Sequence, residues 1–174
     1  MVFIRLFVSA FLFIPLLFGD AMKEEDYTFY LTQIVCPIAK EAQEEFDLFY
    51  IGRGGELAEG VGAVEVKFIA YRRGSLEEAR KIQVTLMERL IRALNTHEKI
   101  RPFLAEYPFP VHRVSIMLAY RKGDDSCYAD GSVVLSFQAK NNLCYFSEDP
   151  KTERSEIIIR EPYEKAKQKV ILGK

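Results

Sequence analysis

Apolar residues recur at helical spacing in two long segments of the chain. In residues 27–50 they return every third or fourth position, with acidic and basic residues between them, which predicts an amphipathic helix. Pro37 interrupts this stripe and predicts either a kink in one helix or the first turn of a second. The second segment opens with Ser75 and Glu78, a capping-box pair, and its apolar stripe ends just before Asn95, the expected cap.

Alternation of apolar and polar residues predicts strands in the rest of the chain. The segments that alternate in this way, or read as short apolar runs, are residues 63–72, 111–121, 132–139, 143–147 and 155–161. The sequence "KNN" predicts a hairpin with Asn141-Asn142 as its turn. In that register Cys144 shares one face of the hairpin with apolar residues and is therefore expected in the core. The residues on that face are Leu135, Phe137, Ala139, Cys144 and Phe146. Pro162 is expected to open a final helix.

This succession of elements predicts an α+β fold, with a mainly antiparallel sheet of four to five strands and helices packed on one face. Consecutive strands after residue 111 are expected to be antiparallel. No repeat or long polar linker divides residues 22–174, which are therefore predicted to form a single domain. The pattern does not fix the order of the strands in the sheet.

Five of the ten glycines lie close together in the stretch "IGRGGELAEGVGAV", residues 51–64. We interpret this stretch as a flexible joint that begins as a helix cap at Gly52 and ends at a strand. A phosphate-binding loop has the opposite order, a strand and then a helix, and neither G-x-G-x-x-G nor G-K-[ST] is present. Arg53 alone does not make such a site.

The N-terminus resembles a secretory signal peptide. Arg5 precedes an apolar run of 14 residues, whereas a membrane span needs about 20. Gly19 and Ala21 supply the small residues of a cleavage site, so residues 1–21 are predicted to be removed. The alternative is an uncleaved membrane anchor. We expect the mature chain, 174 minus 21 or 153 residues, to be exported to a periplasm or secreted, without stable membrane insertion.

The composition excludes several classes of function. A formal net charge of −1, with both signs interspersed, gives no reason to expect nucleic-acid binding. The odd number of cysteines, three, leaves at least one of them unpaired within the chain. Pairing of Cys36 with Cys144 stays open, whereas the hairpin register separates Cys127 from Cys144. No ligand spacing predicts a metal site, and no motif predicts a cofactor.

No catalytic constellation is evident either. Cys127 and His112 lie at opposite ends of a predicted strand, and a cysteine nucleophile needs its histidine within reach. The acidic loop with Asp124, Asp125 and Asp130 lacks the ligand alternation of a calcium loop, so turn formation explains it better. The leading hypothesis is therefore a small exported binding module without catalytic activity. The alternative is an exported hydrolase whose site is assembled from distant residues.

The segment "IRPFLAEYPFP" is the best candidate for a binding site. Its prolines exclude a long helix or a central strand, and rigid aromatics with arginine are typical of protein recognition sites. We predict that Arg101, Phe103, Tyr107 and Phe109 contact a partner, most readily another protein. The competing interpretation is that the aromatic residues close one end of the core.

Overall fold

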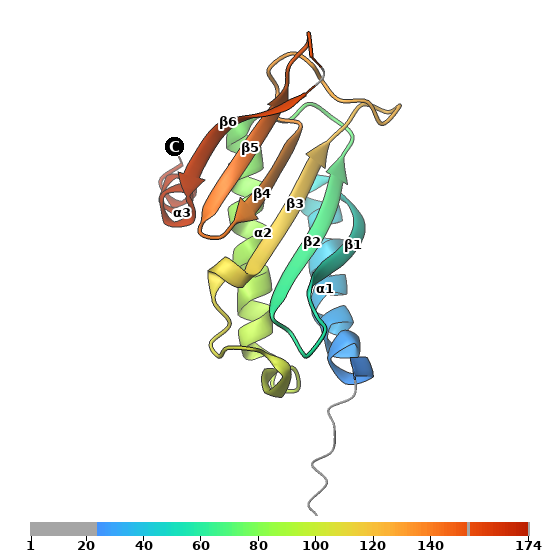
Figure 1. Cartoon of the computed structure of the whole chain (residues 1–174), viewed down its shortest axis with the longest axis vertical. Helices are drawn as coiled ribbons and strands as arrows, with labels where there is room; N and C mark the ends of the chain where they lie inside the picture. Colours follow the sequence, from blue (N-terminus) through green and yellow to red (C-terminus); the bar gives the residue numbers. More distant parts are fainter. Residues whose placement is uncertain (1–23, 153, 174) are drawn as a thin grey trace, which may run out of the picture.

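The computed structural model describes residues 24–152 and 154–173, so the predicted signal peptide lies outside the described residues. Within them the chain forms three helices and six strands (Figure 1). In chain order these are α1 Glu24–Phe46, β1 Phe49–Glu56, β2 Ala63–Ala70, α2 Leu76–Thr96, β3 Val114–Tyr120, β4 Leu135–Ala139, β5 Asn142–Glu148, β6 Ser155–Pro162 and α3 Tyr163–Ile171. Two 3-10 turns, η1 Arg101–Phe103 and η2 Val111–Arg113, lie between α2 and β3.

The six strands form one sheet in the order β1-β2-β3-β4-β5-β6. Only β2 and β3 are parallel, because α2 crosses over between them, and every other neighbouring pair is antiparallel. The strands after residue 111 thus follow one another as predicted. The α+β fold is confirmed, and the sheet has one strand more than the upper end of the expected range.

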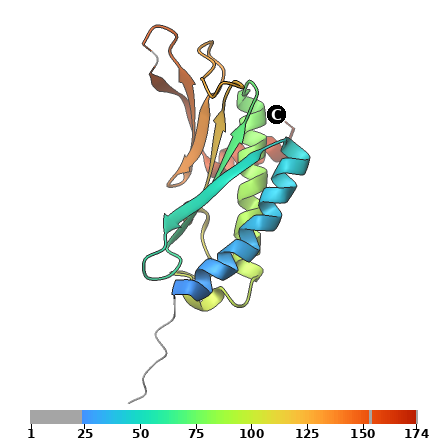
Figure 2. The ribbon, with the colours of Figure 1, turned by 90° about the vertical axis from the view of Figure 1, so that its right-hand side faces the viewer.

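The helices cover one face of the sheet, as Figure 2 shows from the side. α1 packs beside α2 behind β1–β3, and α3 contacts α2, β5 and β6. Alternate residues of β2, from Val64 to Ala70, are buried beneath them. The predicted capping box is present, since the Ser75 hydroxyl accepts a hydrogen bond of 3.1 Å from the Glu78 N–H. α1 runs through Pro37 as one helix.

The glycine-rich stretch was wrongly interpreted as a joint, because its first part, residues 51–56, belongs to β1. α1 ends at Phe46, and the residue in left-handed conformation there is Asp47 (φ 50°), not Gly52. Gly52 (φ 146°) and Gly55 (φ 135°) lie within the strand. A Cβ on Gly55 would come within 1.9 Å of the Ala63 carbonyl oxygen, so the close pairing of β1 with β2 requires glycine.

The β4–β5 hairpin also differs from its predicted register. Ala139 pairs with Asn142, so the turn is Lys140-Asn141, and Lys140 takes the left-handed conformation (φ 58°). A shift of two residues preserves the face of every side chain. Cys144 is buried as predicted, with 1% of its surface exposed, but it lies on the face away from the helices. Cys36 is on α1, across the sheet, so the Cys36–Cys144 pairing that the sequence left open does not form; all three cysteines are free.

The face of the sheet turned away from the helices, here called the open face, is largely apolar. Strand register places six residues side by side across it, and we call this set the apolar row: Phe49, Ile69, Ala119, Leu135, Phe146 and Ile157. Phe146 also stacks on Phe137, with ring centroids 5.2 Å apart. Open faces of antiparallel sheets are usually polar, so this one is unusual for a surface in contact with water.

Candidate functional site

The predicted binding residues lie in the connection between α2 and β3, where the structure brings Arg101 and Tyr107 together. The Arg101 guanidinium carbon sits 4.4 Å from the centroid of the Tyr107 ring, which is cation–π geometry. The Tyr107 hydroxyl donates a long hydrogen bond of 3.4 Å to the Asn95 carbonyl oxygen. Both side chains are exposed, Tyr107 by 49%. No carboxylate among the described residues forms an ion pair with Arg101, so its donor fork is available to a ligand.

Phe109 has a different position in the same connection. Its side chain is 1% exposed and belongs to the core. The Asn95 side chain holds the backbone of Phe109 from both sides, accepting from its N–H at 2.6 Å and donating to its carbonyl oxygen at 3.1 Å. The interpretation that aromatics close the end of the core therefore describes Phe109, while the exposed Arg101 and Tyr107 lie outside that core.

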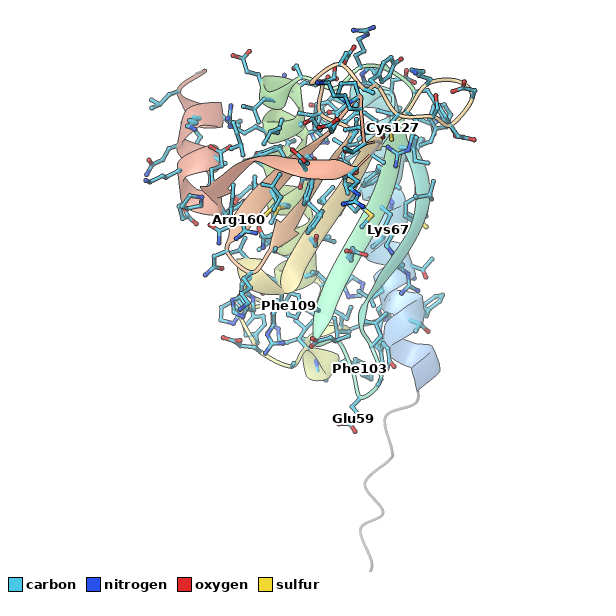
Figure 3. All side chains as sticks on the ribbon, turned by 45° about the horizontal axis from the view of Figure 1, so that its top comes forward. Glu59, Lys67, Phe103, Phe109, Cys127 and Arg160 are labelled. Atoms are coloured by element: carbon cyan, nitrogen blue, oxygen red, sulfur yellow. The ribbon has the colours of Figure 1, made fainter. Side chains whose placement is uncertain are left out.

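Phe103 links the connection to α1, which sequence reasoning had not associated with the site. Its ring lies 5.8 Å from that of Tyr27 and 6.1 Å from that of Tyr30, and Tyr30 also lies 5.6 Å from the His97 ring. Phe29, which is 58% exposed, contacts Tyr30 at 5.7 Å. We call the resulting cluster the aromatic end: Phe29, Tyr30, His97, Arg101, Phe103 and Tyr107. Figure 3 places Phe103 and Phe109 at this end of the molecule.

Hydrogen bonds anchor the aromatic end to the tip of the β1–β2 hairpin. The Val61 N–H donates to the Phe103 carbonyl oxygen at 2.8 Å, and the Ala105 N–H donates to the Val61 carbonyl oxygen at 3.0 Å. Between the hairpin tip and Phe103 lies a hollow of about 770 Å³, whose wall includes Glu56 and Glu59. Phe103 is therefore held from two sides, its ring by aromatic residues of α1 and its backbone by the hairpin tip.

The other candidates from the sequence do not come together as sites. Cys127 lies at the far end of the sheet from Phe109, as Figure 3 shows, and β3 separates it from His112. Burial and a hydrogen bond with Glu148 raise the pKa of the Cys127 thiol, which is the opposite of what an activated nucleophile needs. His97 accepts a hydrogen bond from the Ile100 N–H through its Nδ1 atom, at 3.3 Å.

The acidic loop is built from turns. Asp124 accepts hydrogen bonds from the N–H and hydroxyl of Ser126, and Asp130 does the same with Ser132. Asp125 accepts from the Tyr71 hydroxyl at 2.9 Å. The three carboxylates thus have separate partners, and the described residues contain no group of three or more His, Cys, Asp or Glu placed to hold a metal ion.

Comparison with known proteins gives no family for this chain. No protein-family model, no curated protein and no solved structure matches it. In residues 24–152 and 154–173, no helix combines the length and the apolar character needed to cross a membrane.

Proposed function

We propose that this protein is an exported, non-catalytic binding module that contacts another protein through the aromatic end. The observation that carries the proposal is the exposed Arg101–Tyr107 pair, in which the guanidinium carbon lies 4.4 Å from the ring centroid and no described carboxylate forms an ion pair with Arg101. Arginine and tyrosine are among the residue types that are enriched at the energetic hot spots of protein interfaces. The Asn95 carbonyl oxygen already holds the Tyr107 hydroxyl, and the Tyr107 ring holds the Arg101 guanidinium. Little conformational entropy of these two side chains is therefore lost when a partner docks.

Site-specific photo-crosslinking in the producing cell tests this function. A benzophenone amino acid at position 107 is expected to form an adduct with one protein of the cell envelope, and Arg101→Ala should reduce its yield. The same probe at Lys140, in the exposed β4–β5 turn, is the matched control. Equal adduct patterns at the two positions would remove the support for a binding site at the aromatic end.

A thermal melt separates a binding role from a structural one. Arg101→Ala with Tyr107→Ala should leave the melting temperature almost unchanged, because both side chains are exposed. Truncation of a buried aromatic residue, by contrast, costs about 3–5 kcal/mol. A large drop in melting temperature for the double variant would contradict the proposal and assign the pair to the fold.

We infer export from the signal-peptide-like sequence of residues 1–21. N-terminal sequencing of the protein from the producing cell is expected to begin at Met22. A chain that retains residues 6–18 in a membrane fraction would show the uncleaved anchor instead.

A further inference from the structure

A hollow of about 380 Å³ lies between the first two turns of α2 and the C-terminal end of α3. Figures 1 and 2 both show α3 beside the N-terminal half of α2, so this hollow is remote from the aromatic end, which adjoins the other end of α2. Its size is at the lower end of the range for pockets that bind small molecules. Half of the residues that line it are basic: Glu77, Arg80, Lys81, Lys169, Val170 and Gly173.

The Arg80 guanidinium is the group in this hollow that the fold holds in place. The residue is only 6% exposed, and its Nε atom donates to the Glu161 carboxylate at 2.6 Å. Its two terminal nitrogens donate no hydrogen bond to any described residue, although neither is completely buried. Polar groups with this little exposure normally have a partner. The hollow that Arg80 lines is therefore a place where a ligand can accept from up to four N–H groups of a fixed cation.

The charges around Arg80 favour an anionic ligand. Lys81 is exposed and has no ion pair within the described part of the chain. The Lys169 Nζ atom lies 2.6 Å from the Glu161 carboxylate, and its side chain remains 46% exposed. The carboxylates at the hollow are Glu161 and Glu77. Three cations and two carboxylates leave a net charge of +1, which one singly charged anion neutralises.

We propose that this hollow binds the phosphate group of a phosphodiester, either a soluble one or the headgroup of a phospholipid. Basic groups from two helices line the hollow, and a tetrahedral phosphate offers acceptor oxygens in several directions, whereas a carboxylate offers two in one plane. A phosphodiester also carries the single negative charge that neutralises the hollow. The hollow has room for an organic part of the ester, beside the apolar Val170. This site does not depend on the aromatic end.

Titration of the purified protein with glycerophosphoglycerol, a soluble phosphodiester, tests the site at constant ionic strength. Amide chemical shifts at the first two turns of α2 and at the end of α3 should follow one saturable binding curve. Sodium acetate at the same ionic strength should bind about tenfold or more weakly, because it has fewer oxygens to accept charge-assisted hydrogen bonds.

Variants test whether the hollow itself binds the ester. Lys81→Gln should weaken binding about two- to fivefold, and Glu77→Gln should strengthen it by a similar factor, because each change removes one exposed charge from the wall. Lys165→Gln removes an exposed charge of α3 outside the hollow and is the matched control, with affinity expected to stay unchanged. Arg80→Met together with Glu161→Leu removes the guanidinium, leaves no carboxylate unpaired and keeps the net charge. This double variant should remain folded and bind at least about tenfold more weakly.

Vesicles distinguish a lipid headgroup from a soluble ester. Co-sedimentation with vesicles of phosphatidylglycerol, but not with vesicles of phosphatidylcholine, would support the headgroup if glycerophosphoglycerol reverses it and Lys81→Gln weakens it. Saturable binding of glycerophosphoglycerol without co-sedimentation would support a soluble phosphodiester.

The proposal fails on any of three results. Chemical shifts that rise with glycerophosphoglycerol without saturating would show only screening of surface charge. Equal affinities for acetate and the ester would remove the case for phosphate. Equal effects of Lys81→Gln and Lys165→Gln, on the ester or on vesicles, would place binding outside the hollow.

Discussion

Replacing the buried Glu161 with leucine should strongly destabilise the protein. Glu161 on β6 is 6% exposed, and its carboxylate accepts from the Arg80 Nε atom of α2 at 2.6 Å and from the Lys169 Nζ atom of α3 at 2.6 Å. Arg80 is itself 6% exposed. Loss of the carboxylate would leave a buried guanidinium without its counter-ion, whereas Lys169, 46% exposed, can turn to water.

The size of the effect follows from this burial. Removing one partner of a buried ion pair costs about 3–5 kcal/mol. In a domain of about 150 residues, 1 kcal/mol shifts the melting temperature by about 2–4 °C, so Glu161→Leu should lower it by about 6–20 °C. Lys169→Ala should cost no more than about 1 kcal/mol, because that partner is half exposed. The double variant Arg80→Met with Glu161→Leu should recover most of the loss, since an apolar pair can replace a buried ionic one.

The stability that Glu161→Leu loses relative to wild type should depend on pH, because the Glu161 carboxylate can be protonated. Burial acts to raise the pKa of Glu161, but the hydrogen bonds and charges of Arg80 and Lys169 outweigh it, so the pKa lies below its ordinary value. A group whose pKa is lowered on folding stabilises the protein above its unfolded pKa, about 4.3, and loses that contribution as the pH falls through the folded value. The gap in melting temperature between wild type and Glu161→Leu should therefore narrow below about pH 4.

Melts by circular dichroism between pH 3 and pH 7 measure both effects. A loss below about 1 kcal/mol at pH 7 would mean that Arg80 reaches water, and would refute the argument from burial. A gap that stays constant down to pH 3 would refute the argument from the lowered pKa of Glu161.

Three further changes test the packing. Asn95→Ala removes both hydrogen-bond partners of the Phe109 backbone and should lower the free energy of unfolding by about 1–3 kcal/mol in a urea titration. Gly74→Ala would bring a Cβ within 2.5 Å of a buried tyrosine ring and should cost about 1–3 kcal/mol, measured the same way. Under native conditions a thiol reagent should modify the exposed Cys36 rapidly and the buried Cys144 only as fast as the protein opens, and equal rates would contradict the sheet register.

Local patterns in the sequence predicted the elements whose structure is decided locally. The capping box at Ser75 and the alternation from Val64 to Ala70 each have a short-range physical cause, and both predictions are confirmed. β1 was missed because glycines favour loops when read locally, whereas here pairing with β2 overrides that preference. The hairpin turn was misplaced because alternation fixes the face of a residue but not a shift of two positions.

The candidate site was predictable only in its own segment. Arg101 and Tyr107 were singled out because prolines and aromatics are concentrated around them, and they do meet in the structure. Tyr30 and His97 belong to other elements, and their contact with each other depends on how α1 packs beside α2. One local signal could have pointed to Tyr30, an aromatic residue on α1 that falls outside the buried stripe.

The edges of the sheet give a physical reason why a partner should add to a face and not extend the sheet. Both edge strands carry an irregularity with an isoleucine as the extra residue, Ile51 in β1 and Ile158 in β6, and these side chains are 55% and 43% exposed. A bulge interrupts the row of outward N–H and C=O groups that another strand would need, and natural proteins use it to prevent edge-to-edge pairing. Protected edges leave the apolar row as the larger unpartnered surface of the sheet.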